Sequence, residues 1–201
     1  MTPRPTVLPL GDRAVLVETG DALRALSLAT WARGAGLVAD EIVPAAQTVM
    51  FAGLDDPTAL LAALDAWPDE PPEPSAAVVE LPVSYDGPDL AYAAQAWGVD
   101  VSEVPGLHAR QDFVVAFCGF APGFAYLAGL PAELALPRLA TPRTRVPAGS
   151  VAVADAWTGV YPSASPGGWR LLGRTTVPLF DPSAAQPALL VPGTRVRLVP
   201  Q

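Results

Sequence analysis

Glycine and proline recur every few residues between residues 117 and 175, and large aromatic side chains stand among them. Glycine permits backbone conformations that other residues avoid, whereas proline fixes φ. An ordinary loop needs only one or two such residues, so this segment predicts a shaped surface or pocket. The aromatic residues at its turns are Phe120, Phe124, Tyr126, Tyr161 and Trp169.

The composition indicates a globular protein with a real core. The chain has 201 residues, of which 51% are hydrophobic and 16% charged, enough for one large domain or two small ones. No apolar run approaches the length of a bilayer span, and the first residues lack the apolar region of a signal peptide. We therefore expect a cytoplasmic protein with no membrane partner.

The charge and the residue inventory exclude several classes of function. A formal net charge of −8 argues against a nucleic-acid partner. All 12 basic residues are arginine, which excludes a Walker A phosphate loop and a lysine nucleophile or base. The single cysteine, Cys118, and the single histidine, His108, are too few for a disulfide or a structural zinc site. We expect no metal site.

The first third of the chain alternates between strand and helix patterns. Helices are expected after Asp21 and Asp56, which are good N-cap residues, the second helix with Pro57 at its first position. Strand-like runs occupy residues 6–10, 14–18, 37–43 and 47–53.

An acidic, proline-rich linker at residues 68–75 leads to another strand-like run at 76–83. With this run as the last strand, the order β-α-β-β-α-β is that of a ferredoxin-like domain. We place this domain at residues 1–75, its last strand crossing over into a second domain at residues 76–201.

The second domain has a different pattern. One helix is expected after Gly87-Pro88, ending at Gly98, and Ser102 can cap a short helical turn beyond it. Residues 112–120 form a continuous apolar run that is typical of a buried strand. Short strand-like segments with glycine and proline turns then follow, which indicates a closed or nearly closed barrel. The predicted fold class is therefore α+β.

A repeated proline–arginine pair carries candidate binding chemistry. Arg138 and Arg143 each follow a proline, and Arg145 lies two residues further on. In an extended, proline-set segment, positions two apart face the same side. Arg143 and Arg145 then project together as a fork for a carboxylate or phosphate. The alternative is a pair of surface arginines that balance an acidic protein.

The SPGGW segment at residues 165–169 and the single histidine, His108, are further candidates for the functional site. Gly167 and Gly168 allow a ligand to approach closely, and successive N–H groups can bind an anion. The alternative is a tight barrel corner packed by Trp169. His108 is able to act as a general base or to polarise a carbonyl, and the alternative is a hydrogen-bonded structural residue.

Several long motifs resemble one family. They are GPDL at 87–90, LHA at 107–109, GFAPGFAYL at 119–127, the two PR units, VPAGSVA at 146–152 and YPSASPGGWRLLGRT at 161–175. Nearly the whole chain is similar, in order, to the KipI/PxpB family, the B subunit of bacterial 5-oxoprolinase, also called allophanate hydrolase subunit 1. The resemblance implies a ferredoxin-like N-terminal domain followed by a cyclophilin-like β-barrel.

The resemblance also implies an activity and partners. Members act with PxpA, and with a homologous protein called PxpC or KipA, to convert 5-oxoproline to glutamate with ATP. ATP and Mg²⁺ are expected to be shared with those partners, so the chain alone is expected to be inactive. Three alternatives stay open: an inhibitor of a sensor histidine kinase, a carboxyl-transfer subunit related to urea carboxylase or allophanate chemistry, and a prolyl isomerase suggested by the barrel alone.

The site residues follow from the same motifs. His108 and Arg143 are the predicted catalytic residues. The predicted substrate-binding residues are Phe120, Pro122, Gly123, Phe124, Tyr126, Arg138, Arg145, Gly149, Ser150, Ser165, Pro166, Gly167, Gly168 and Trp169.

Overall fold

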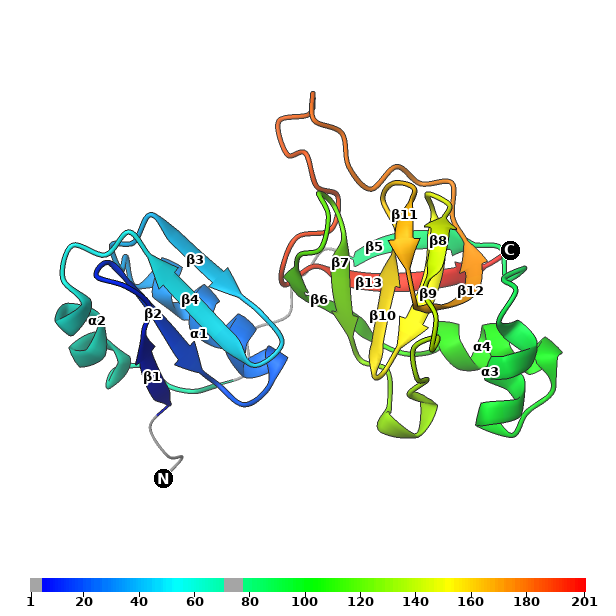
Figure 1. The fold of residues 1–201 in the computed structure, drawn as a ribbon, viewed down its shortest axis with the longest axis horizontal. Helices are drawn as coiled ribbons and strands as arrows, with labels where there is room; N and C mark the ends of the chain where they lie inside the picture. Colours follow the sequence, from blue (N-terminus) through cyan, green and yellow to red (C-terminus); the bar gives the residue numbers. More distant parts are fainter. Residues whose placement is uncertain (1–4, 71–77) are drawn as a thin grey trace. The chain divides into compact units, whose positions relative to one another are not determined.

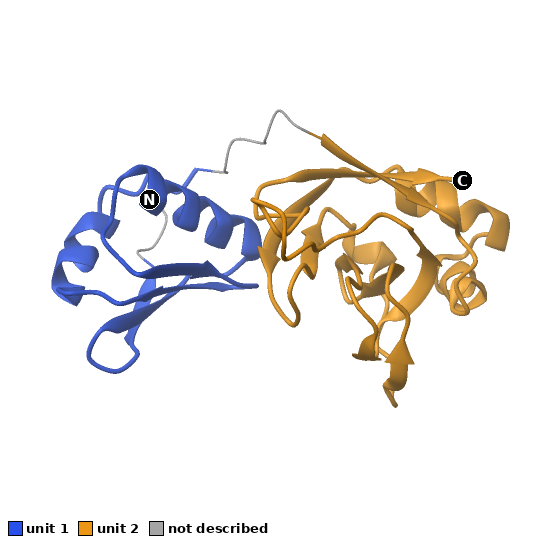
Figure 2. Cartoon of the chain, turned by 90° about the horizontal axis from the view of Figure 1, so that it is seen from above, with its two compact units in different colours: residues 1–73 blue, residues 74–201 orange. Residues whose placement is uncertain are grey.

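The computed structural model describes residues 5–70 and 78–201, and the chain divides into two units at residues 1–73 and 74–201 (Figures 1 and 2). Each unit encloses a hydrophobic core of its own. Most of the predicted linker falls on residues 71–77 and so lies outside the described residues.

Four short strands build the sheet of the first unit. All pairs are antiparallel, and the order is β1-β2-β4-β3. The strands are β1 (Thr6–Pro9), β2 (Ala14–Glu18), β3 (Glu41–Pro44) and β4 (Thr48–Ala52). Alternate residues such as Val17 and Phe51 turn into the core, as the period of two along a strand requires.

Helices α1 (Ala22–Gly34) and α2 (Pro57–Leu64) pack on that core. Both begin where the sequence predicts. The Asp21 carboxylate accepts from the Arg24 N–H, and the Asp56 carboxylate accepts from the Thr58 N–H. These side chains satisfy N–H groups that the first helical turn leaves unpaired.

The last strand of the predicted β-α-β-β-α-β order belongs to the sheet of the second unit. Strand β5 (Val78–Val83) pairs in parallel with a strand of the second unit, over the whole of its length. Within the first unit, β1 pairs with β2 and takes the edge position. The prediction that residues 76–83 complete the first sheet is therefore wrong for the described part of that run, because the apolar pattern specifies a strand but not its partner.

A seven-stranded sheet dominates the second unit, in the order β12-β9-β10-β7-β6-β13-β5. Besides β5, its strands are β6 (Phe113–Cys118), β7 (Ala125–Ala128), β9 (Ser150–Ala154), β10 (Trp157–Val160), β12 (Arg170–Arg174) and β13 (Arg195–Pro200). A separate two-stranded ribbon pairs β8 (Arg143–Val146) with β11 (Ser165–Gly167).

Four helical segments complete the described part of the second unit. They are α3 (Leu90–Trp97), α4 (Val104–Ala109) and the 3₁₀ turns η1 (Val101–Glu103) and η2 (Ala132–Leu134). Gly98 ends α3 in the left-handed conformation, as its sequence position predicts.

The two edges of the seven-stranded sheet meet, which makes it nearly closed (Figure 1). Just beyond β5, Ser84 and Arg174 of β12 exchange two backbone hydrogen bonds of 2.9 Å each. Further on, the Gly87 N–H donates to Leu172 O at 3.1 Å. A Cβ on Gly87 would lie 2.2 Å from Leu171 O, so only glycine lets the chain run this close to β12. The α+β class and the nearly closed barrel are thus confirmed.

The sheet is buried on both faces along β9, where every residue is buried. Val151 and Val153 belong to the barrel core, whereas Ala152 and Ala154 belong to a second cluster on the opposite face. This outer face carries the aromatic residues predicted for the site. Among the described residues, no helix has the length and hydropathy to cross a membrane.

Candidate functional site

Seven aromatic rings form one network on the outer face of the barrel. We call it the aromatic cluster; its members are Phe117, Phe120, Phe124, Tyr126, Trp157, Tyr161 and Trp169. The Phe124 ring is central, with its centroid 5.4 Å from that of Trp169 and 5.3 Å from that of Tyr161. Both contacts are edge-to-face, a geometry that aromatic pairs prefer.

Small residues in the sheet make room for these rings. Gly159 of β10 lies under two of them: a Cβ there would be 2.9 Å from the Trp169 ring and 3.0 Å from the Phe124 ring. Gly167 is needed for a similar reason, because a Cβ there would lie 2.3 Å from Tyr161 Oη. The SPGGW segment is therefore a tight corner that fits around aromatic side chains, which is the packing alternative raised for it.

Phe120 is the exposed edge of the aromatic cluster. Phe120 is 62% exposed, whereas Phe124, Tyr161 and Trp169 are buried. Its φ of 69° lies in the left-handed region, which is unfavourable for a bulky residue and costs roughly 1–3 kcal/mol. A strained, exposed phenylalanine beside a packed cluster is a feature that packing alone does not explain.

Arg138 and Arg143 flank the aromatic cluster. The Arg138 guanidinium lies 5.9 Å from the Trp169 ring centroid. The Arg143 Nη1 donates to Trp169 O at 3.2 Å. The predicted residues Phe120, Phe124, Tyr126, Arg138, Arg143 and Trp169 are thus brought together on one face.

A cavity of about 550 Å³ opens beside this face, between β8, β12 and residues 84–88. We call residues 84–88 the closing segment, because they join the β5 edge of the sheet to β12. We call the cavity the arginine cavity; it is lined chiefly by Asp86, Gly87, Pro88, Arg143, Arg145 and Arg174. Arg143 and Arg145 therefore face one space, as their spacing in an extended segment predicts. Ser150 also lines it, but the Ser150 hydroxyl donates to Pro147 O at 2.8 Å.

Arg143 is held by a carboxylate that lies outside the predicted site residues, that of Asp89. Asp89 follows the closing segment, and its buried carboxylate accepts from Arg143 Nη2 at 2.9 Å and from the Leu171 N–H at 2.6 Å. Arg170 Nη1 lies 3.7 Å from the other carboxylate oxygen. Arg143 is therefore a fixed cation, not a free fork. No local pattern could reveal Asp89, since its partners lie 54 to 82 residues away.

His108 lies in a different place, inside the barrel core. It is fully buried, and its ring nitrogens are each 2.9 Å from a hydroxyl, Nδ1 from Tyr85 Oη and Nε2 from Thr158 Oγ1. Burial lowers the pKa of His108 from 6.5 to about 3, so it is neutral at physiological pH. With both nitrogens occupied and no exposed surface, this geometry favours the structural alternative.

The other predicted residues shape the backbone. Gly149 is in the left-handed region, and a Cβ there would lie 2.2 Å from Thr175 O. Gly123 packs against Phe180, and Pro122 and Pro166 are exposed. Gly168 O accepts from the Leu139 N–H at 2.7 Å. The buried Ser165 Oγ has no hydrogen-bond partner within the described part of the chain.

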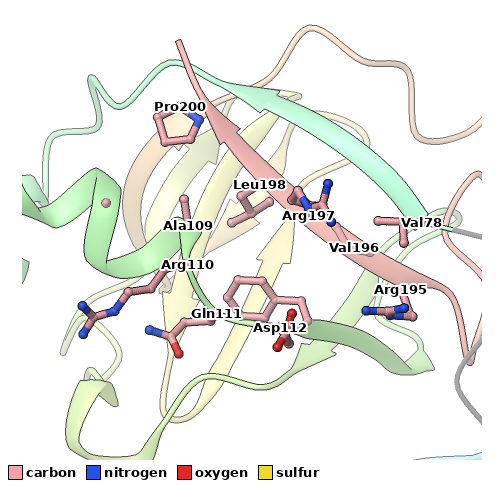
Figure 3. Close-up of a pocket in the computed structure, with 12 residues that line it drawn as sticks. Val78, Ala109, Arg110, Gln111, Asp112, Arg195, Val196, Arg197, Leu198 and Pro200 are labelled. Atoms are coloured by element: carbon pink, nitrogen blue, oxygen red, sulfur yellow. The ribbon is translucent and has the colours of Figure 1, made fainter.

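A second pocket, shown in Figure 3, contains none of the predicted site residues. It measures about 400 Å³ and lies between α4, β6 and β13. In Figure 3, Arg110 and Arg195 stand at opposite ends of it. In residues 5–70 and 78–201, no group of three or more His, Cys, Asp or Glu side chains is arranged to hold a metal ion.

Comparison with known proteins identifies the family. The carboxyltransferase domain family, subdomains C and D, matches residues 5–190. The chain belongs to this family. The resemblance to the KipI/PxpB family is likewise confirmed, since proteins named as the B subunit of 5-oxoprolinase share 51% identity (Escherichia coli O157:H7) and 44% identity (Bacillus subtilis) with it. The matched segments cover 64% and 61% of this chain and only 61% and 52% of those relatives.

Several solved structures share the fold of this chain. An uncharacterized protein of Pyrococcus horikoshii, PH0987, is 36% identical over 98% of this chain and 97% of its own, with a TM-score of 0.61. The protein TTHA0988 is 37% identical with a TM-score of 0.77, and the match covers 94% of this chain but 40% of that one. A Kluyveromyces lactis urea amidolyase, at 20% identity and a TM-score of 0.72, shares the fold over 98% of this chain and 15% of its own.

Proposed function

We propose that this chain is one subunit of a bacterial ATP-dependent 5-oxoprolinase that converts 5-oxoproline to glutamate together with PxpA and PxpC. The observation that carries the proposal is the 44–51% identity to proteins named as the B subunit of 5-oxoprolinase. The matches span 52–61% of those relatives, so the activity of the whole relative is inferred for this chain. A cytoplasmic location is part of the proposal.

The site chemistry supports a binding role. The substrate carries a carboxylate, and the arginine cavity offers guanidinium groups beside the aromatic cluster. Such groups can hold an anionic substrate and stabilise developing charge. In this proposal the outer face, with exposed Phe120 at its edge, contacts a partner protein or closes over the substrate.

The described residues do not by themselves fit a magnesium–nucleotide site. The chain has no lysine for a phosphate loop, and the described residues offer no carboxylate cluster for a metal ion. ATP and Mg²⁺ therefore belong to the assembled complex in this proposal, and no step is assigned to them. The chain alone is expected to be inactive.

The test is glutamate release from 5-oxoproline with ATP, measured for the chain alone and with PxpA and PxpC. We expect turnover only in the assembled complex. Within the complex, Arg143→Ala is expected to cost about 2 kcal/mol or more of transition-state stabilisation, roughly a thirtyfold loss. Arg197→Ala is the control, since that exposed arginine pairs with Glu80. Robust turnover by the chain alone would contradict the shared site.

One alternative has an observation in its favour. The matching family is named for carboxyl transfer, and the fold is shared with a Kluyveromyces lactis urea carboxylase at 20% identity, with a TM-score of 0.69. A carboxyl-transfer protein would require a carboxylated carrier and no 5-oxoproline. Assay of the complex with 5-oxoproline and ATP, without bicarbonate, separates the two proposals.

The assignment of each unit to a known fold type is also part of this proposal. We infer a ferredoxin-like first unit in which β1 fills the sheet edge usually taken by the last strand. We infer a cyclophilin-like barrel for the second unit, with β5 and β12 as the strands that close it.

A further inference from the structure

The three arginines that line the arginine cavity differ in how many partners their guanidinium groups have. Arg174 Nη2 lies 2.8 Å from an Asp86 oxygen, and Arg143 is bonded to Asp89 and to Trp169 O. The Arg145 guanidinium makes no hydrogen bond or ion pair with any described residue. One cation in this cavity is therefore free to bind a ligand, and two others stand beside it.

The lining offers little else for a ligand to bind. Gly87, Pro88, Pro147 and Ala148 contribute no polar side chain, and the Ser150 hydroxyl proton is already donated. The guanidinium groups are thus the side-chain donors of the cavity. Arginine has five N–H donors in a planar fork that matches a carboxylate or phosphate, so the tethered Arg143 keeps donors to spare.

The local charge also favours an anion, although the whole protein carries −8. Three arginines and one carboxylate, that of Asp86, face the cavity. Asp89 lies behind Arg143 and is shared with Arg170. Counting all six groups, four cations face two anions, which leaves an excess of two positive charges.

We propose that the arginine cavity is an oxyanion-binding site in which Arg145 is the direct ligand, Arg143 is a second cation fixed by Asp89, and Asp86 competes with the anion for Arg174. The ligand group is a carboxylate or a phosphoryl group. Its assignment to the carboxylate of 5-oxoproline rests on the proposed function, whereas the site itself does not.

The test is titration of the full chain at constant ionic strength, followed by the ¹H–¹⁵N signals of the arginine Nε–H groups. The probes are inorganic phosphate, 5-oxoproline, and 2-pyrrolidinone, which is the same lactam without its carboxylate. We expect saturable shifts of the Arg145 signal with the two anions and none with 2-pyrrolidinone. Tighter binding of phosphate than of 5-oxoproline identifies a phosphoryl ligand, and the reverse order identifies a substrate carboxylate.

Matched variants separate this site from general charge effects. Arg145→Ala is expected to weaken anion binding about tenfold, as loss of one charge-assisted contact predicts. Arg110→Ala removes an exposed arginine of the other pocket and is expected to change nothing. Asp86→Asn is expected to tighten binding roughly threefold by freeing Arg174. The control for this variant is Glu80→Gln. Glu80 forms an exposed ion pair with Arg197, and its N–O distance of 2.9 Å is close to that between Arg174 and Asp86.

Different results would contradict the oxyanion-binding site and the proposed function. Absence of saturable binding of either anion, or equal binding by the wild-type chain and Arg145→Ala, overturns the oxyanion site. Binding that depends on Arg145 supports it, even if the assembled complex releases no glutamate from 5-oxoproline, in which case only the proposed function fails. The variants lie on exposed side chains, so their folding is checked simply by an unchanged melting temperature.

Discussion

The buried His108 makes the stability of the second unit depend on pH in a way that one substitution removes. In the folded chain burial lowers its pKa from 6.5 to about 3. In the unfolded chain the ring takes up a proton near pH 6.5. Between these values the unfolded state binds one more proton than the native state, so stability falls as the pH falls.

The size of the effect follows from linkage. Each pH unit below 6.5 costs about 1.4 kcal/mol, so the chain at pH 5 should be about 2 kcal/mol less stable than at neutral pH because of this residue. The ordinary pKa values of Asp and Glu side chains lie near 4, below this window, whereas that of histidine lies within it. Domains are stable by only about 5–15 kcal/mol, so the loss is easily measured.

His108→Gln keeps hydrogen-bonding capacity towards Tyr85 and Thr158 but does not titrate. We expect it to be less stable than the wild-type chain at pH 7 and to have lost the histidine's share of the slope between pH 7 and 5. Differential scanning calorimetry is the suitable assay, since it can resolve separate transitions from two units with separate cores. In the assembled complex the variant should retain turnover within about threefold.

Two results would refute this reasoning. Equal pH slopes in the two proteins would show that His108 is not held neutral by burial. A loss of turnover of about a hundredfold, with unchanged stability, would restore the general-base hypothesis.

Two further substitutions test interactions inside the individual units. Arg24→Lys should cost about 1–2 kcal/mol in urea unfolding, because Arg24 binds Asp69 through two 2.8 Å contacts that lysine cannot reproduce; Arg197→Lys in the exposed pair with Glu80, a single contact of 2.9 Å, should cost nothing measurable. Gly159→Ala should cost about 1–3 kcal/mol by thermal melting and alter tryptophan fluorescence, because its Cβ would meet the Trp169 ring at 2.9 Å. Gly168→Ala, whose nearest contact would be 3.7 Å, is the control, and equal losses would mean that crowding at Gly159 is not the cause.

The sequence was informative wherever the physical cause is local. Asp21 and Asp56 cap the helices that their positions predict, and Gly98 ends α3. The shared direction of Arg143 and Arg145 also follows from a local rule, the two-residue period of an extended chain. Each of these inferences depends on contacts within a few residues along the chain.

The failures involve distant partners. The pattern of residues 76–83 specifies a strand, but only the fold supplies β13 as its neighbour. Asp89 is the N-cap residue of α3 by position, yet its carboxylate makes no capping bond and turns to Leu171 and Arg143. The catalytic interpretation of His108 rests on the acid–base chemistry of imidazole, which carries no information about burial, and so stays a prediction.

The net charge shows the same distinction between whole-chain and local properties. Residues 1–73 carry eleven acidic residues and four arginines, whereas residues 74–201 carry nine acidic residues and eight arginines. The acidic excess is therefore almost entirely a property of the first unit. The second unit is close to neutral, and the four cations and two anions at the arginine cavity give it a local positive excess. Because solution ions screen charges beyond about 10 Å, a small anion at the cavity responds to these few groups far more than to the chain total. A charge of −8 thus argues against a polyanionic partner and leaves the binding of a single carboxylate or phosphate fully open.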